Sequence, residues 1–283
     1  MNVVVAKYAG FCFGVNRAVN AVNKLIGEGK KVCTLRQIIH NKQVVDDFSS
    51  KGVLVANSVF EIPKGYVVVI SSHGCTRQEL SYIEKNNFDY VDTTCPFVKK
   101  VHKIVEANID KKFLLVAGDS KHPEVLGICS YFNNKSYVFC DVEDLKNIVE
   151  NNKIQNSEDV LVVSQTTFSN EKWLNCTNFI KKLFTNAMIC DTICNVTNLR
   201  QKEAESLSKK SDLMLVAGSR NSSNTLKLYE ICRKITNTIF VESKSDILGK
   251  PIYGCENVGI IAGASTPVDF VNDIKSILCE RYM

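Results

Sequence analysis

The chain has 283 residues, of which 45% are hydrophobic and 23% charged, and its 35 basic and 30 acidic side chains give a net charge of +5. The length permits a large buried core, and the composition is ordinary for a globular enzyme and unlike that of a disordered chain. The small positive charge is spread along the sequence, which favours a site for a small anion over a groove for nucleic acid. The unusual number is that of cysteine, 12 in all.

These cysteines do not follow the pattern of a secreted, disulfide-bonded protein. Lys7 interrupts the first apolar run, so the N-terminal sequence does not have the form of a signal peptide. No apolar stretch approaches the roughly 18 residues that a membrane-spanning helix needs. We therefore expect a cytoplasmic protein with no membrane partner, in which the cysteines are thiols or metal ligands.

The spacing of the cysteines excludes several common sites. No two of them form a C-x-x-C pair, which argues against zinc ribbons, thioredoxin-like motifs and ferredoxin-like motifs. Most are expected to be buried like small hydrophobic residues. This expectation applies to the five that lie inside apolar stretches: Cys33, Cys140, Cys190, Cys232 and Cys279.

In chain order, short apolar runs alternate with amphipathic segments. The runs are rich in Val, Ile and Phe, as expected for strands of a parallel sheet that is covered on both faces. The predicted strands are 3–6, 53–55, 67–70, 90–91, 113–117, 137–139, 160–163, 188–189, 213–217, 239–241 and 258–261. Between them, segments such as 15–26 and 97–108 repeat apolar residues with the period of a helix. This alternation predicts an α/β fold with small, mainly parallel sheets.

The predicted strands repeat along the chain. The sequence Asp-Thr-Thr-Cys at 92–95 recurs as Asp-Thr-Ile-Cys at 191–194, which is 99 residues later, and Val-Ala-Gly at 116–118 recurs at 216–218. Residues 88–187 and 187–283 therefore resemble two copies of one unit, and the segment before residue 88 resembles a third, shortened copy. We divide the chain into three α/β units, 1–90, 91–189 and 190–283, that share one central site.

Polar residues keep the same register in each unit. Cys12, Cys95 and Cys194 are followed 27 or 28 residues later by His40, His122 and Ser222. A second polar residue follows a later strand of each unit, and these residues are His73, Thr166 and Ser265. Ligands of open α/β sheets bind at the carboxyl ends of the strands. Three such units around a common axis would bring three thiols and a ring of polar groups together.

Three thiols that each precede a predicted helix point to a metal centre. Amide groups at a helix N-terminus favour the thiolate form of cysteine. Three thiolates suit either zinc, with water as its fourth ligand, or an iron–sulfur cluster with one open iron. The alternative is that Cys12, Cys95 and Cys194 are ordinary buried thiols, and their repeated placement favours a site.

Other polar groups in the same register predict an anion site. Histidine can donate to an anion, and the small polar loops at 221–224 and 263–267 resemble phosphate cradles at helix N-termini. Taken alone, each loop is equally compatible with a simple helix N-cap. His102 falls among lysines in the middle of a predicted helix, so we expect it on the surface. Glu124 follows Pro123 and has two possible roles, a proton donor in the site or a partner of the helix dipole.

At this point the residues resemble a known family. The motifs are Gly-Phe-Cys-Phe-Gly-Val at 10–15, His-Asn at 40–41, Ser-His-Gly at 72–74, Asp-Thr-Thr-Cys-Pro at 92–96, His-Pro-Glu-Val at 122–125, Gln-Thr-Thr at 165–167, Asp-Thr-Ile-Cys at 191–194, Gly218 with Asn-Ser-Ser-Asn at 221–224, and Gly-Ala-Ser at 263–265. Together they resemble the 4-hydroxy-3-methylbut-2-enyl diphosphate reductases, the last enzymes of the non-mevalonate isoprenoid pathway. The resemblance extends from residue 3 to about residue 270. Cys75 and Thr93 depart from the family's usual residues, and Cys75 could place an extra thiol near the site.

The resemblance implies a three-lobed, trefoil-like α/β fold around one 4Fe-4S cluster, held by Cys12, Cys95 and Cys194 with one iron open to substrate. The implied reaction removes an allylic hydroxyl with two electrons and two protons, giving isopentenyl and dimethylallyl diphosphate. Ferredoxin or flavodoxin would supply the electrons to a monomer. The diphosphate would be held by His40, His73, His122, Ser222, Ser223, Asn224 and Ser265. Glu124 would relay protons, and Thr166 would lie near the hydroxyl.

Two other functions are compatible with the same residues. A hydro-lyase would use a three-cysteine cluster as a Lewis acid without net redox chemistry. A regulatory or binding module would hold zinc or a cluster without catalysis, although so many ligand-like donors argue against it.

Overall fold

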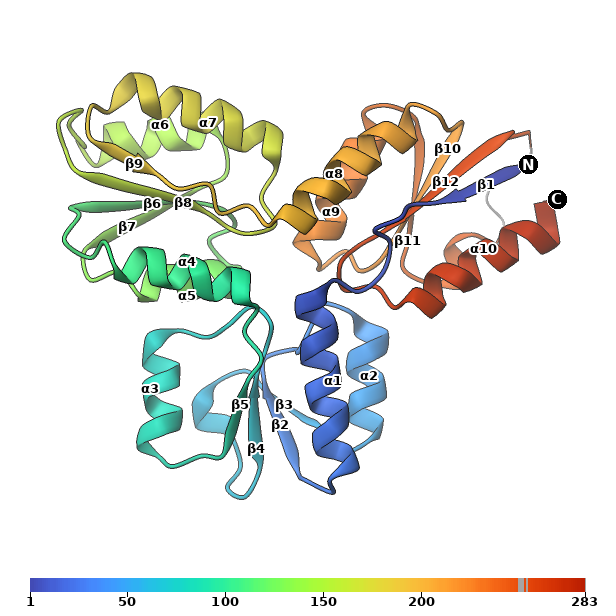
Figure 1. Ribbon diagram of the computed structural model, residues 1–283, viewed down its shortest axis with the longest axis horizontal. Coiled ribbons are helices and arrows are strands. Elements are labelled where there is room, and N and C mark those ends of the chain that lie inside the picture. Colours follow the sequence, from blue (N-terminus) through green and yellow to red (C-terminus); the bar gives the residue numbers. More distant parts are fainter. Residues whose placement is uncertain (249–251, 253, 283) are drawn as a thin grey trace. The chain divides into compact units, whose positions relative to one another are not determined.

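The computed structural model describes residues 1–248, 252 and 254–282, and in them strands and helices alternate along the chain (Figure 1). The α-helices are α1 (Phe13–Gly27), α2 (Lys42–Ser50), α3 (Arg77–Lys85), α4 (Pro96–Glu106), α5 (Pro123–Ser130), α6 (Val142–Asn151), α7 (Asn170–Leu183), α8 (Asn195–Ser208), α9 (Ser223–Arg233) and α10 (Val268–Tyr282). None of these helices is long and apolar enough to cross a bilayer.

The strands form three four-stranded sheets in which every pairing is parallel. The strands are β1 (Asn2–Val5), β2 (Val32–Leu35), β3 (Leu54–Ala56), β4 (Val67–Ile70), β5 (Tyr90–Asp92), β6 (Phe113–Ala117), β7 (Lys135–Phe139), β8 (Val160–Ser164), β9 (Ala187–Ile189), β10 (Leu213–Ala217), β11 (Asn237–Val241) and β12 (Asn257–Ala262). The α/β class with small parallel sheets is confirmed.

The sheets share one strand order and reveal the frame of the repeat. Their orders are β3-β2-β4-β5, β7-β6-β8-β9 and β11-β10-β12-β1. The first strand of the chain, β1, therefore takes the place in the third sheet that β5 and β9 take in the other two. The first copy is shorter along the chain, as predicted, but its sheet has all four strands, β2 to β5.

All eleven predicted strands are present, and of the strands in the described residues one, β2, was missed. It lies in the middle of its sheet between β3 and β4, and all four of its residues are buried. Its sequence, Val-Cys-Thr-Leu, lacks the Val, Ile and Phe run that marks the other central strands. Thr34 is 1% exposed, and its hydroxyl donates to the carbonyl of Leu54, so the polar side chain is satisfied inside the fold.

The chain separates into two compact units that differ from the three sheets. One consists of residues 1–16, 39–47 and 195–283 and contains the sheet β11-β10-β12-β1. The other consists of residues 17–38 and 48–194 and contains the two remaining sheets. We call them the terminal unit and the middle unit. The division of the chain at 90/91 and 189/190 stays a prediction.

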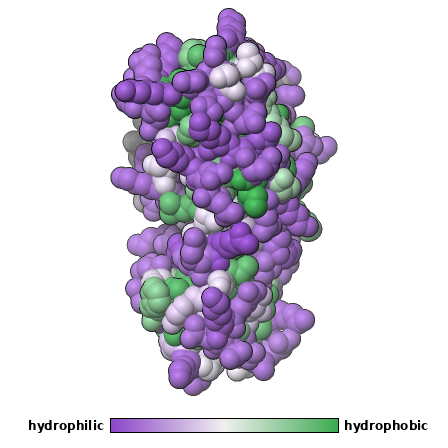
Figure 2. Space-filling model, turned by 90° about the vertical axis from the view of Figure 1, so that its left-hand side faces the viewer, coloured by the Kyte–Doolittle hydropathy of each residue, from purple (hydrophilic) through white to green (hydrophobic). Residues whose placement is uncertain are grey.

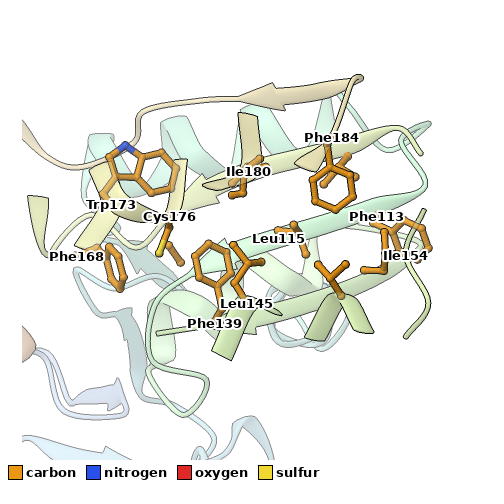
Figure 3. Close-up of a cluster of buried hydrophobic side chains, with 14 residues drawn as sticks. Phe113, Leu115, Phe139, Leu145, Ile154, Phe168, Trp173, Cys176, Ile180 and Phe184 are labelled. Atoms are coloured by element: carbon orange, nitrogen blue, oxygen red, sulfur yellow. The ribbon is translucent and has the colours of Figure 1, made fainter. Parts of the chain in front are cut away.

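In the sheet β7-β6-β8-β9, the two central strands, β6 and β8, are buried on both faces. On one face β6 and β8 pack against α6 and α7 in a cluster that includes Phe139, Trp173 and Ile180 (Figure 3). On the other face they pack against α4 and α5 through a second cluster that includes Leu114 and Val125. Burial of one such side chain stabilises the fold by about 1.5–3 kcal/mol. This two-sided packing fixes the strand ends at which the candidate site lies.

The surface of the molecule is more polar than these cores. The face of the molecule drawn in Figure 2 is covered mainly by hydrophilic residues, with apolar ones scattered between them. Scattered apolar residues of this kind are normal for a folded surface.

Candidate functional site

Cys12, Cys95 and Cys194 each stand directly before a helix. They precede Phe13 of α1, Pro96 of α4 and Asn195 of α8, as predicted. The carbonyls of Cys12 and Cys95 accept the first helical hydrogen bonds, from the backbone N–H groups of Asn16 and Lys99, at 2.9 Å in both cases. All three side chains are partly exposed, and none of the twelve cysteines, which all lie in the described residues, forms a disulfide. These thiols are therefore accessible at positions where helix amide groups favour a thiolate.

In the middle unit, Cys95 lies beside the first of two histidines. The backbone N–H of Cys95 donates to the carbonyl of Ser72 at 3.0 Å, which holds the cysteine next to His73. The ring of His73 meets the ring of His122 edge to face, with 5.2 Å between the ring centres. His122 caps α5, because its Nδ1 accepts from the N–H of Glu124 at 3.2 Å. This bond fixes which ring nitrogen is left to face a ligand.

Glu124 lies in the first turn of α5 and is 2% exposed. Its Oε1 accepts from the backbone N–H of Thr166 at 2.6 Å, and its Oε2 accepts from the Thr166 hydroxyl at 3.0 Å. Burial raises the pKa of Glu124 to about 7, and the two hydrogen bonds from Thr166 oppose this rise. A carboxyl group of this kind can hold or release a proton at neutral pH.

Thr166 also connects Glu124 to the third cysteine. The carbonyl of Thr166 accepts from the N–H of Cys194 at 2.9 Å. Thr166 follows β8, and Thr192, two residues before Cys194, is tied to the end of β8 through a hydrogen bond from its hydroxyl to the carbonyl of Ser164. The middle unit thus joins a titratable carboxyl, a hydroxyl and a thiol-bearing loop in one connected group.

In the terminal unit, one loop gathers Cys12, His40 and Ser265. The N–H of Cys12 donates to the carbonyl of Ala264 at 3.1 Å. The hydroxyl of Ser265 donates to the carbonyl of His40 at 3.2 Å. The loop between β12 and α10 therefore holds a thiol-bearing segment and a histidine-bearing segment.

The N-terminus of α9 supplies the remaining polar groups of the terminal unit. Ser222 caps the helix by accepting from the N–H of Thr225 at 3.4 Å, and Ser223 is the first helical residue. Asn224 is 4% exposed, and both polar atoms of its amide lack a hydrogen-bond partner among the described residues. A buried amide without partners costs about 1–3 kcal/mol for each unsatisfied group, which makes Asn224 a candidate for contact with a polar ligand.

Close packing brings the ends of β10 and β12 against this helix turn. A Cβ atom on Gly263 would lie 1.9 Å from Oγ1 of Thr225, and one on Gly218 would lie 2.8 Å from the same atom. Gly218 also has a φ of +139°, which side-chain-bearing residues rarely adopt. Only glycine fits at these two positions, and the contact fixes where Ser222, Ser223 and Asn224 stand.

The structure corrects two predictions about other residues of the middle unit. His102 is buried, because its face of α4 packs on α5, where its ring stacks on Tyr131 with 4.4 Å between centres. Burial lowers the pKa of His102 to about 4, so it is neutral in the fold at neutral pH. Cys75 is 4% exposed in the core with Ile83, and burial raises the pKa of its thiol to about 12. Cys75 is therefore a buried, protonated thiol of the core.

The expectation of buried cysteines holds only in part. Cys33 and Cys232 are fully buried, and Cys190 is partly buried. Cys140 and Cys279 are exposed, although apolar residues surround them in the sequence. Cys140 follows the end of β7, and Cys279 lies on α10, so local composition did not indicate the side that faces solvent.

Sequence reasoning missed two arginines that contact the cysteine-bearing segments. Arg17 donates to the carbonyls of Asp92 and Thr94, both at 2.9 Å. Arg200 donates to the carbonyls of Gly10 and Ala262, at 2.7 and 2.9 Å. The available signal was their spacing, because each follows a cysteine of the set by five or six residues.

The donors present fit a metal or iron–sulfur centre. Thiolates are the preferred ligands of iron–sulfur clusters and also bind zinc. The fold and site thus define an α/β protein built from parallel-sheet repeats, each with a thiol before a helix and polar groups at its strand ends. Residues 3–279 match the family model described as LytB protein, and the chain therefore belongs to the LytB family.

Relatives and solved structures agree with this assignment. The chain is 38% identical to a 4-hydroxy-3-methylbut-2-enyl diphosphate reductase of Caldanaerobacter subterraneus subsp. tengcongensis, with 99% of both chains covered. It is 38% identical to the enzyme of that name from Citrifermentans bemidjiense, covering 97% of this chain and 95% of the relative. A solved structure of (E)-4-hydroxy-3-methyl-but-2-enyl diphosphate reductase, the terminal enzyme of the non-mevalonate pathway, matches with a TM-score of 0.71 at 35% identity over 99% of this chain and all of that one. The reductase structure from Plasmodium falciparum, at 23% identity and a TM-score of 0.86 over 98% of this chain and 87% of that one, shows the shared fold alone.

Proposed function

We propose that this chain is an iron–sulfur reductase that removes the allylic hydroxyl of 4-hydroxy-3-methylbut-2-enyl diphosphate. Substrate, two electrons and two protons would give isopentenyl or dimethylallyl diphosphate and water. The carbon–oxygen bond breaks, the oxygen leaves as water, and the allyl skeleton takes one hydrogen. The observation that carries the proposal is the buried Glu124–Thr166 pair joined to the Cys194 loop, in a chain that shares 38% identity with reductases of this name.

Cys12, Cys95 and Cys194 would hold one 4Fe-4S cluster, which leaves one iron open to substrate. When bound, the cluster would pass electrons from the external donor to the substrate and would act as a Lewis acid for the hydroxyl oxygen. In this proposal the three repeats surround the cluster, as in a trefoil. The backbone ties of the three cysteines to Ala264, Ser72 and Thr166 then serve to hold each thiol in place.

The diphosphate would be bound by uncharged donors and histidines. The proposed set is His40, His73, His122, Ser222, Ser223, Asn224 and Ser265. Of these, Asn224 gives the strongest support, because its buried amide lacks partners among the described residues. The amide N–H groups at the start of α9 add a favourable dipole for an anion.

Glu124 and Thr166 would deliver protons to the reacting hydroxyl. With the pKa of Glu124 near 7, its Oε2 can carry the proton and donate it to Oγ1 of Thr166. The Thr166 hydroxyl then turns its own hydrogen toward the substrate. The bond from the Thr166 N–H to Oε1 keeps the carboxyl in place while the proton moves. His122, whose Nδ1 is held by the Glu124 N–H, orients the start of this path and lines the diphosphate pocket.

The remaining parts of the proposal concern partners. Ferredoxin or flavodoxin would donate the electrons to a cytoplasmic monomer. Mixing the reduced donors with the protein and measuring turnover would identify the donor, and light scattering of the purified protein would give the oligomeric state.

Anaerobic purification followed by metal analysis tests the cofactor. Four iron and four sulfide per chain would support the proposal, whereas one zinc per chain would exclude it. Turnover of 4-hydroxy-3-methylbut-2-enyl diphosphate should require a reductant such as dithionite with a viologen mediator. Product formation without reductant would favour the hydro-lyase, and a cluster without any turnover would favour the regulatory module.

A further inference from the structure

Two arginines hold the backbone just ahead of two of the cysteines. In the middle unit, Arg17 binds the carbonyls of Asp92 and Thr94, which are three residues and one residue before Cys95. In the terminal unit, Arg200 binds the carbonyl of Gly10, two residues before Cys12, and that of Ala262 at the end of β12. Each guanidinium therefore spans two carbonyls with its planar fork of N–H groups.

We propose that Arg17 and Arg200 are positioning residues that fix the thiols of Cys95 and Cys12 for the cluster. The inference rests on the proposed function, because it takes these cysteines as ligands. The two arginines occupy related places, since Arg17 follows Cys12 by five residues and Arg200 follows Cys194 by six. The helix that starts at one cysteine thus carries the group that holds the segment ahead of another.

The four carbonyls lie where regular structure ends. Asp92 and Ala262 are the last residues of β5 and β12. Thr94 and Gly10 lie in segments ahead of the cysteines that are neither strand nor helix, and the arginines donate to carbonyls at these places. A buried carbonyl without a donor costs about 1–3 kcal/mol. Arg200 is itself 2% exposed, so its charge is removed from water and its position is set by the groups that it binds.

A second side chain on α8 binds the same loop, but as a hydrogen-bond acceptor where Arg200 is a donor. The carboxylate of Glu203 accepts from the backbone N–H groups of Lys7 and Tyr8, at 2.6 and 3.0 Å. Glu203 and Arg200 are three residues apart, on one face of the helix. Together they hold donors and acceptors of the loop that leads to Cys12. Gly10 lies in the same loop and has a φ of +105°, a backbone conformation that favours glycine.

On the Cys95 side, the held segment is also fixed from within. Oδ1 of Asp92 accepts from the N–H of Thr94 at 2.9 Å, and Oδ2 of Asp92 pairs with Lys99. The Cys95 N–H is bound to Ser72 at 3.0 Å. Arg17 adds the two bonds that connect this turn to α1. Groups that orient a metal ligand from behind typically change metal affinity or activity by about 10–100-fold when they are removed.

The test uses Arg17→Met and Arg200→Met, which keep side-chain length and remove the donors. A matched control is Arg36→Met, because the Arg36 guanidinium also makes two hydrogen bonds, but to both carboxylate oxygens of Glu79 on α3 and not to the backbone ahead of a cysteine. In the loaded protein, a ferrous chelator should strip the cluster about 10–100-fold faster from the first two variants than from the wild type. The electron paramagnetic resonance spectrum of the reduced cluster should also change. The control should keep the wild-type rate and spectrum even if its melting temperature falls.

A second readout does not depend on the cluster. In the cluster-free full-length protein, alkylation of each cysteine is followed by mass spectrometry, with the exposed Cys140 and Cys279 as internal standards. Arg17→Met should change the rate at Cys95 severalfold and leave Cys12 unchanged, and Arg200→Met should do the reverse. Arg17→Lys should restore part of the effect, because lysine keeps a donor but not the fork.

The outcomes separate this inference from the proposed function. Wild-type chelation rates, spectra and alkylation patterns in both methionine variants would overturn the inference and leave the reductase proposal standing. A wild-type protein that binds no iron and sulfide would overturn the proposed function. The alkylation pattern would then still decide whether the arginines hold Cys12 and Cys95, and an unchanged pattern would reject it.

Discussion

In the proposed function, single residues of this chain carry two kinds of chemistry, thiol ligation and proton transfer, and these residues have different surroundings in the structure. The three thiols that precede helices are partly exposed, whereas Glu124 is almost completely enclosed. Exposure keeps a thiol available to a metal, and burial raises the pKa of a carboxyl group toward neutral pH. Each environment can be tested by one substitution at a time.

For Glu124, the change is Glu124→Gln, which keeps the shape. The amide oxygen can still accept from the Thr166 N–H, and the amide nitrogen would donate to the Thr166 hydroxyl instead of accepting from it. Burial raises the pKa of Glu124 to about 7, above its ordinary 4.5, so the folded state binds the proton more tightly than the unfolded state. The free energy of unfolding of the wild type therefore falls as pH rises from about 4.5 to 7, by about 3 kcal/mol at most. The cluster-free variant should be more stable than the wild type at pH 8 and equal to it near pH 4.5, as measured by urea unfolding.

The same variant should lose turnover while it keeps iron, sulfide and substrate binding, because the proton carrier is gone. Its kcat should fall at least about 100-fold. Wild-type kcat in Glu124→Gln would remove this residue from the reaction. Equal stability of the two proteins at pH 8 would instead contradict the raised pKa.

For the thiols, Cys12→Ser, Cys95→Ser and Cys194→Ser should each abolish the cluster, because an alcohol replaces a thiolate ligand. Iron and sulfide analysis with the visible spectrum measures the loss. Cys279→Ser is the matched control, since Cys279 is exposed on α10, and it should keep the full cluster and activity. An intact cluster in any of the first three variants would remove that residue from the ligand set.

At the scale of elements, the fold places polar residues by pressing strand ends onto helix starts. In the terminal unit, the glycines after β10 and β12 lie against Thr225 in the first turn of α9. Because α9 carries Ser222, Ser223 and Asn224, the closeness of this contact decides where the proposed diphosphate donors stand. Because this contact is tight, an atom added at either glycine would displace the first turn of the helix.

We expect Gly263→Ala to push α9 away, because its Cβ would lie 1.9 Å from Oγ1 of Thr225. Overpacking of this kind costs about 1–3 kcal/mol of stability. The KM for the diphosphate substrate should rise, while the iron and sulfide content stays at the wild-type level. Gly27→Ala is the control, since no atom lies within 4 Å of its added Cβ, and it should leave KM and stability near those of the wild type. An unchanged KM in Gly263→Ala would show that α9 does not position the substrate.

At the scale of the whole molecule, the first strand of the chain completes the sheet formed by the last three strands. The strand β1 pairs with β12, from Asn2 opposite Asn257 to Val5 opposite Ile260, and so fills the fourth place of the third sheet. Without β1 that sheet would have three strands, and β12 would become an edge. The sheet therefore cannot be completed until both ends of the chain are present.

Val4→Pro tests this closure. The N–H groups of Asn2 and Ala6 donate to the carbonyls of Glu256 and Ile260, so the alternation of a parallel ladder directs the Val4 N–H to β12 as well. Proline at this position removes the bond, and we expect a loss of about 2–3 kcal/mol in the free energy of unfolding. Val4→Ala removes the same exposed side chain but keeps the N–H, and it should cost less than about 1 kcal/mol. Equal melting temperatures of the two variants would show that β1 does not hold the sheet.

The sequence by itself determined the class of fold, eleven of the twelve strands and the three cysteines before helices. Each is a local property, since apolar runs and helical periods can be read from neighbouring residues, and the repeat appears as closely similar short motifs. The tertiary structure decided the rest. It decided that β1 completes the last sheet, that His102 and Cys75 are buried, and that Arg17 and Arg200 hold cysteine-bearing loops. These facts depend on contacts between residues that are far apart in sequence. The strand β2 is a further example, because its own residues do not form an apolar run and only its place between β3 and β4 buries it.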